Sequence, residues 1–204
     1  LTTGSDGSIY IAGSTDGGWN GFDAFISKFN PDGVEEWRTI LGTGEDDYAY
    51  ALTTGSDGSI YIAGSTRGNL PSWDRSNPGT NAGTYLDYGG DLDDAFISKV
   101  NPDGTQGWTR LLGTPHHEYG EALTTGSDGS IYMSVRTYIN ANFNDVVGTG
   151  PFISKFNPEG GEEWRRFNGS GDLTTGSDGS IYIGGGNSDV FIDKFNPNGT
   201  KDWS

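Results

Sequence analysis

The 204-residue sequence contains no cysteine, a single methionine and only two histidines. Without cysteine, the chain forms no disulfide bond and offers no thiolate ligand to a metal ion. No apolar run approaches the roughly 18 residues that a membrane-spanning helix needs, so we expect no membrane insertion. The histidines, His116 and His117, are adjacent. Because neighbouring strand residues point to opposite sides of a sheet, these two would share a metal ion only from an irregular loop.

Basic residues are also scarce. The chain has 12 lysines and arginines against 28 aspartates and glutamates, which gives a formal net charge of −16. A surface this negative repels phosphate backbones, so we expect no nucleic-acid partner. It is repelled by anionic membranes for the same reason. The charge does suit solubility and divalent cations.

The sequence makes no case for catalysis. A cysteine nucleophile is impossible, the histidines have no recognisable serine partner, and the loop carboxylates are too numerous to single out a pair. We therefore expect a protein that is not an enzyme. A hydrolase that uses loop carboxylates remains the catalytic alternative.

The most prominent feature of the sequence is an internal repeat. The letters "LTTGSDGSIY" occur at 1–10, 52–61, 123–132 and 173–182. Periods of about 40–50 residues are typical of propeller blades. Alternating apolar residues in "SIYIAG" and "DAFISKFN" predict strands, while "SDGS" and "NPDG" predict tight turns. Each copy thus predicts four antiparallel strands, and each ends in a tryptophan expected at an equivalent outer-strand position: Trp37, Trp108, Trp164 and Trp203.

The motifs "LTTGSDGSIYIAGST" and "DAFISKFNPDG", with the closing tryptophan, resemble the SBBP family of bacterial β-propeller repeats. The resemblance covers almost the whole chain except the long loops. It implies an all-β propeller of four-stranded antiparallel blades, with four blades visible, and an extracellular or cell-surface location. It implies no general activity. We predict a single domain with blades at about 1–47, 48–118, 119–170 and 171–204.

The copies differ in the connections between the second and third strands, at 14–22, 65–93, 136–149 and 186–188. In a propeller these connections share one face with the connections between blades, which also vary: "GTGEDDYAYA", "GTPHHEYGEA" and the shorter "GSGD". This variable face is therefore the predicted binding surface. Aromatic residues there that break the repeat are ligand-binding candidates: Trp19, Phe22, Trp73, Tyr85, Tyr88, Tyr138 and Phe143. They would stack on a sugar, form a protein–protein hot spot, or build a small core for the longest loop.

Acidic residues gather in the longest connection, at Asp87, Asp91, Asp93 and Asp94. Calcium needs six to eight oxygen ligands, which these carboxylates and nearby carbonyls could supply, although the spacing matches no EF-hand. The alternative is a solvated acidic loop. Calcium is the one cofactor that the sequence suggests.

We therefore expect a non-catalytic structural and binding module for adhesion or assembly, with a protein partner or self-assembly. A glycan-binding propeller is the alternative. The chain starts inside a repeat and without methionine, so we expect a piece of a longer protein. The outward faces of the first and last blades should be covered by each other, by further blades or by a neighbouring subunit. Of these, we favour a larger assembly.

Overall fold

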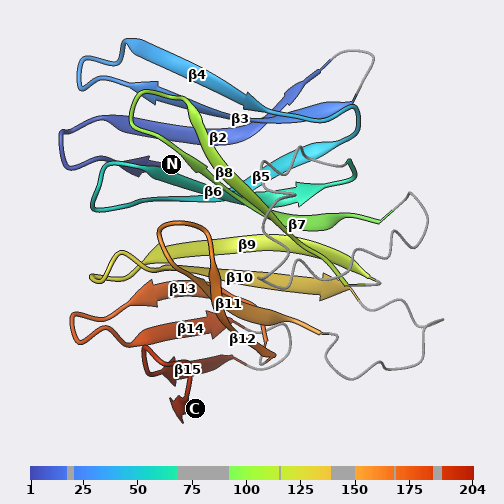
Figure 1. Ribbon diagram of the computed structural model, residues 1–204, viewed down its shortest axis with the longest axis vertical. Helices are drawn as coiled ribbons and strands as arrows, with labels where there is room; N and C mark the ends of the chain where they lie inside the picture. The colour runs from blue at the N-terminus through green and yellow to red at the C-terminus, as the bar shows by residue number, and fades with distance from the viewer. Residues whose placement is uncertain (18–20, 69–91, 115, 139–149, 168, 186–189) are drawn as a thin grey trace.

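The computed structural model describes residues 1–17, 21–68, 92–114, 116–138, 150–167, 169–185 and 190–204 (Figure 1). Within these residues, sixteen strands form four four-stranded antiparallel sheets, and no helix occurs. The described residues accordingly contain no helix that could cross a membrane. The predicted all-β fold of four-stranded antiparallel blades is confirmed.

Each sheet is a blade whose strands pair in chain order. Blade 1 contains β1 (Thr2–Thr3), β2 (Ile9–Asp16), β3 (Phe22–Phe29) and β4 (Glu35–Leu41). Blade 2 contains β5 (Asp47–Thr54), β6 (Ile60–Thr66), β7 (Asp94–Val100) and β8 (Gln106–Leu112). Blade 3 contains β9 (His117–Thr125), β10 (Ile131–Tyr138), β11 (Phe152–Phe156) and β12 (Glu162–Phe167). Blade 4 contains β13 (Asp172–Thr175), β14 (Ile181–Gly185), β15 (Phe191–Phe195) and β16 (Lys201–Trp203).

The repeated decapeptide forms the first hairpin of each blade. The Asp6 carboxylate accepts hydrogen bonds from the Ser8 N–H at 3.0 Å and the Ser8 hydroxyl at 2.9 Å. Between them, Gly7 has a φ of 82°, a conformation that side chains other than glycine rarely adopt. The same pair of hydrogen bonds recurs at Asp57, Asp128 and Asp178. The repeated letters therefore specify a turn of the scaffold.

The apolar core lies between blades rather than inside one blade. Because strand side chains alternate, each blade has two faces. We call the face of blade 1 that carries Tyr10 and Ile26 its trailing face, and the face of blade 2 that carries Ile60 and Phe96 its leading face. These two faces form one core cluster, and equivalent clusters join blade 2 to blade 3 and blade 3 to blade 4.

A tryptophan side chain bridges the two blades at each of these junctions. The indole N–H donates to a proline carbonyl of the next blade in three cases: Trp37 to Pro102 at 3.3 Å, Trp108 to Pro158 at 3.0 Å and Trp164 to Pro197 at 3.2 Å. Each ring also covers the glycine of that N-P-x-G turn. A Cβ added to Gly160, for example, would lie only 2.6 Å from the Trp108 ring. The repeat thus encodes the junction as well as the blade.

All four tryptophans occupy the fourth strand of their blade, as predicted. Trp37, Trp164 and Trp203 stand opposite Lys28, Lys155 and Lys194 of the neighbouring strand. Each tryptophan also packs beside the tyrosine of its own "SIY" segment, with ring centroids between 5.9 and 6.2 Å apart. The four tryptophans are therefore equivalent residues of the four sheets.

The blades form a row with blade 1 and blade 4 at opposite ends (Figure 1). β2 packs against β5, β5 against β9, and β9 against β13. Among the described residues, no comparable packing joins β1–β4 to β13–β16. Mutual covering of the two end blades, one of the three expected arrangements, is therefore not what this structure shows.

Candidate functional site

Five aromatic side chains form a continuous strip across three blades. This aromatic strip consists of Phe22 at the start of β3, Tyr48 and Tyr50 in β5, Tyr119 in β9, and Tyr138 at the end of β10. From Phe22 to Tyr138, successive ring centroids lie 5.7, 6.3, 6.2 and 5.6 Å apart. The strip therefore crosses blades 1, 2 and 3 at the strand ends that lead into or follow the variable connections.

Much of the strip faces solvent. Phe22, Tyr50 and Tyr138 are 45%, 49% and 51% exposed, respectively, while Tyr48 and Tyr119 are half-buried. Tyr48 and Tyr50 lie two residues apart in β5, where a β-bulge between Ala49 and Ala51 interrupts the pairing with β6, and their rings stack on each other. Their rings are nearly parallel, with an interplanar angle of 8°. An exposed aromatic surface of this kind is a common feature of interaction sites.

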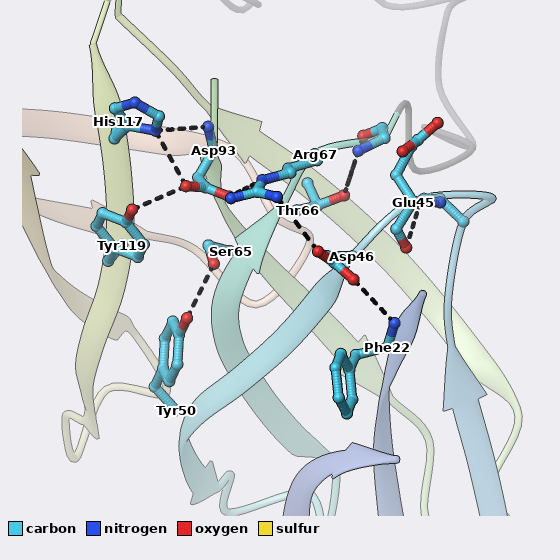
Figure 2. A network of polar contacts seen from close by, with 12 residues as sticks. Phe22, Glu45, Asp46, Tyr50, Ser65, Thr66, Arg67, Asp93, His117 and Tyr119 are labelled. Carbon is cyan, nitrogen blue, oxygen red and sulfur yellow. Dashed lines mark hydrogen bonds and ion pairs between the residues drawn. The ribbon is translucent and has the colours of Figure 1, made fainter. Parts of the chain in front are cut away.

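A polar network centred on Asp93 holds the strip in place (Figure 2). The Asp93 carboxylate accepts from Arg67 Nε at 3.0 Å and from the Tyr119 hydroxyl at 2.8 Å, and it lies 3.0 Å from His117 Nδ1. Arg67 also contacts Asp46 at 3.3 Å. Since Asp93 is only 4% exposed, it acts as a fixed anchor for these groups.

The same network connects blade 1 to blade 2. The other oxygen of Asp46 accepts from the Phe22 backbone N–H at 3.0 Å, across 24 residues of sequence. The Tyr50 hydroxyl lies 3.1 Å from the Ser65 hydroxyl (Figure 2). Hydrogen bonds therefore connect the Phe22 backbone and the Tyr50 side chain to neighbouring parts of the scaffold.

Burial raises the pKa of the Tyr50 hydroxyl, and burial together with the hydrogen bond to Asp93 raises the pKa of Tyr119. Both phenols consequently stay neutral at physiological pH. Arg136 stacks over the rings of Tyr119 and Tyr138, at 5.4 and 4.5 Å from their centroids. The strip thus combines neutral phenols with a guanidinium, a combination enriched in protein interfaces.

A buried carboxyl group is hydrogen-bonded to the connection that precedes Tyr48, and another to the connection that precedes Tyr119. Glu118, next to Tyr119, accepts hydrogen bonds from the N–H and the hydroxyl of Thr114. Burial raises the pKa of Glu118 to about 8. Asp47, next to Tyr48, likewise accepts from the Thr43 N–H at 2.6 Å and its hydroxyl at 2.9 Å. Burial raises the pKa of Asp47 as well.

Two of the predicted binding residues, Phe22 and Tyr138, lie in the aromatic strip. The others fall outside the described residues: Trp19, Trp73, Tyr85, Tyr88 and Phe143. Sequence reasoning missed Tyr48, Tyr50 and Tyr119 because they lie in strands that belong to the repeat. The signal was present in "GTGEDDYAYA" and "GTPHHEYGEA", which carry tyrosines that the shorter connection "GSGD" lacks.

Two of the four predicted calcium ligands lie among the described residues, and two do not. Asp87 and Asp91 lie outside the described residues, and Asp94 is the first residue of β7. Asp93 is already paired with a cation, because Arg67 contacts its carboxylate. Over the described part of the chain, no three histidine, cysteine, aspartate or glutamate side chains are grouped to hold a metal ion. With Asp87 and Asp91 outside the described residues, the calcium site stays a prediction.

We expect Asp93→Asn to lower the free energy of unfolding by about 1–2 kcal/mol. The substitution removes a charge-assisted hydrogen bond to Arg67 and the acceptor of the Tyr119 hydroxyl. Chemical unfolding curves measure the loss. The matched control is Asp103→Asn, on an exposed turn. Equal stability of wild type and Asp93→Asn would mean that the network does not hold the strip.

A family model described as a beta-propeller repeat, SBBP, matches residues 36–71. The match supports the family resemblance drawn from the repeated motifs. Among curated proteins, the regulatory protein FlaEY of Caulobacter vibrioides is 27% identical over 178 residues. That alignment covers 78% of this chain and 18% of FlaEY.

Two solved structures of proteins of unknown function match this chain along most of its length. One, from Dyadobacter fermentans, has a TM-score of 0.53 and 12% identity, over 96% of this chain and 58% of that protein. The other, from Bacteroides caccae, has a TM-score of 0.49 and 13% identity, over 94% and 56%. This chain therefore spans less than two thirds of the length of each of these relatives.

Proposed function

Because this chain carries a propeller repeat of the SBBP type, we propose that it is a non-catalytic binding module that holds a protein partner on its aromatic strip. The observation that carries the proposal is the exposure of Phe22, Tyr50 and Tyr138 on one continuous surface. Side chains of this size are ordinarily buried, and their alignment across three blades is not needed for packing within any one blade. The module would act outside the cell or at its surface, in adhesion or assembly.

The chemistry of the strip favours a protein over other partners. Tyrosine and arginine, with tryptophan, are the residues enriched among those that dominate protein–protein binding energy. Here Arg136 is stacked on Tyr138, and both are partly accessible, at 41% for the arginine side chain and 51% for the tyrosine. Rigid scaffold contacts hold the aromatic strip, so a partner would bind a surface that is already ordered.

The geometry around Asp93 supports a binding role rather than a catalytic one. A general base or nucleophile must reach substrate with an accessible oxygen. Asp93 is 4% exposed, and its two carboxylate oxygens contact Arg67, His117 and Tyr119. We assign it to positioning of the strip.

Glycan binding is a second candidate, favoured by the accessible ring of Tyr50. A pyranose ring stacks on an aromatic face while neighbouring polar groups bind its hydroxyls. Tyr50 offers such a face, and Arg67 and Asp46 lie in the adjoining network (Figure 2). A glycan array probed with wild-type protein and with Tyr50→Ala tests this candidate. Binding that Tyr50→Ala abolishes would favour a glycan over a polypeptide.

Site-specific photo-crosslinking in cells that produce the protein tests the main proposal. A photoreactive residue at position 138 should give a defined adduct with one protein. The same residue at position 40 should not, because Ile40 is comparably exposed, at 47%, but lies outside the strip. The adduct should disappear when Tyr50→Ala is added. Equal adducts from positions 138 and 40 would contradict the proposal.

A further inference from the structure

A cation already lies on part of the aromatic strip. The guanidinium of Arg136 is stacked over the rings of Tyr119 and Tyr138, at 5.4 and 4.5 Å from their centroids. We call the other three rings the open half of the strip: Phe22, Tyr48 and Tyr50. Within the part of the chain that the structure describes, no lysine or arginine is stacked on the open half. The open half is therefore available to a cation from another molecule.

The open half is accessible to solvent. Phe22 and Tyr50 are among the exposed aromatic side chains of the strip. The rings of Tyr48 and Tyr50 are nearly parallel, and their centroids lie 6.3 Å apart. An aromatic face attracts a lysine or arginine side chain that is held within about 6 Å of its centroid. Since the chain places its own Arg136 on the adjoining rings at such distances, the open half offers the same contact to a partner.

Carboxylates surround the open half. Asp16 is exposed and lies directly opposite Phe22 in the pairing of β2 with β3, which places both side chains on the same face of blade 1. Glu45 is exposed in the connection that leads to β5. Asp46, the next residue, accepts a hydrogen bond from the Phe22 backbone (Figure 2). Burial raises the pKa of the Tyr48 hydroxyl, and the Asp46 carboxylate raises it further. A positive charge is therefore favoured beside these rings.

The two arginines near the strip are already neutralised by carboxylates. Arg67 contacts both Asp46 and Asp93, and Arg136 forms an ion pair with Glu121 at 2.5 Å. The whole chain carries a formal net charge of −16. At long range, this charge repels an acidic partner and accelerates the encounter with a basic one. The exposed rings and the charge around them therefore favour the same ligand, a cationic side chain.

We infer that the open half of the strip binds a lysine or arginine side chain from a basic segment of the protein partner. This inference rests on the proposed function and names the chemistry by which the partner is recognised. The cationic group stacks on the rings of Tyr48 and Tyr50, and Asp16 and Glu45 supply the opposite charge. An apolar partner would use the rings but not the carboxylates, and an acidic partner would be repelled by them.

Synthetic octalysine tests the inference without the partner itself. At low ionic strength, calorimetric titration should show that octalysine binds the wild-type chain. Octalysine acetylated on every side chain has lost its positive side-chain charges and should show no measurable binding. Added salt should weaken the binding of octalysine, because salt screens interactions between exposed charges. In NMR spectra, octalysine should shift the ring signals of Tyr50.

Two matched pairs of variants separate stacking on the strip from general attraction to an acidic protein. Tyr50→Phe keeps an aromatic ring, whereas Tyr50→Leu keeps only apolar bulk. Tyr50→Leu should therefore bind octalysine at least about threefold more weakly than Tyr50→Phe. Asp16→Asn and Asp103→Asn each remove one negative charge, but Asp103 lies in the turn that follows β7. Asp16→Asn should bind octalysine about twofold more weakly than Asp103→Asn. Circular dichroism checks that all four variants fold.

Three results would overturn the inference: no binding of octalysine to the wild type, equal affinities of Tyr50→Phe and Tyr50→Leu, or equal affinities of Asp16→Asn and Asp103→Asn. None of these results would contradict the proposed function, because a partner held by apolar contacts would still give the defined crosslink from position 138. Conversely, equal crosslinking from positions 138 and 40 would contradict the proposed function whatever the affinity for octalysine. The two failures are therefore distinguishable.

Discussion

Trp108→Ala should destabilise the fold by about 3 kcal/mol, near the lower end of the cost of removing a buried tryptophan. The substitution removes the indole ring from the junction between blades 2 and 3. There the ring packs against Gly160, and its N–H donates to the Pro158 carbonyl at 3.0 Å. Trp203→Ala is the matched control, because Trp203 is the equivalent residue of blade 4 and is 44% exposed, with no other blade packed on it among the described residues. We expect Trp203→Ala to cost less than half as much in dilute solution.

The glycine on the other side of the junction gives an independent measurement. Gly160→Ala and Gly33→Ala impose similar backbone strain, with φ values of 83° and 80°. Only Gly160→Ala brings a Cβ to 2.6 Å from the Trp108 ring. It should therefore cost at least about 1 kcal/mol more than Gly33→Ala. Denaturant midpoints of the four variants measure the difference in stability within the tryptophan pair and within the glycine pair. Equal losses within each pair would show that the tryptophans do not hold the blades together.

The protein should lose stability as the pH rises from about 5 to 8, and Glu118→Gln should remove much of that loss. Burial raises the Glu118 pKa from 4.5 to about 8, so the folded state binds its proton more tightly than the unfolded state. The stabilising contribution is complete below pH 4.5 and is lost as the pH approaches 8. At about 1.4 kcal/mol per pKa unit, the shift from 4.5 to about 8 corresponds to roughly 5 kcal/mol, most of which is lost between pH 5 and 8.

Because other carboxyl groups also titrate, the informative quantity is the difference between wild type and variant at each pH. Glu159→Gln removes the same charge from an exposed turn and serves as the control. Melting curves at several pH values should converge for wild type and Glu118→Gln at low pH, and should favour Glu118→Gln at high pH. A constant difference across the range would show that Glu118 is ionised in the folded protein at pH 5.

The scaffold could be predicted from sequence because its signals are local. Asp6 and Gly7 define a turn through contacts within four residues, and alternation around Ile9 defines a strand. The repeat then places Trp37 at an equivalent position in every blade. Even so, what Trp37 contacts could not be read from one copy, because its partner Pro102 lies 65 residues away.

The site was less predictable because it depends on contacts between blades. Phe22 and Tyr138 attracted attention as aromatic residues outside the repeat. Tyr50 did not, because its strand belongs to the scaffold, although its exposure decides the character of the surface. Asp93 was interpreted as a candidate calcium ligand because it lies in a cluster of aspartates in the longest connection. Its contact with Arg67 could not be predicted in the same way, because it joins residues 26 positions apart.

The most direct test of the binding surface is the affinity of the crosslinked partner, once purified, for wild type and strip variants. Tyr50→Ala and Tyr138→Ala should each weaken binding at least about tenfold, as expected for exposed aromatic anchors. Ile40→Ala should bind like the wild type, and enzymatic deglycosylation of the partner should not change its affinity. Equal affinities of wild type, Tyr50→Ala and Tyr138→Ala would contradict the assignment of the aromatic strip as the binding site.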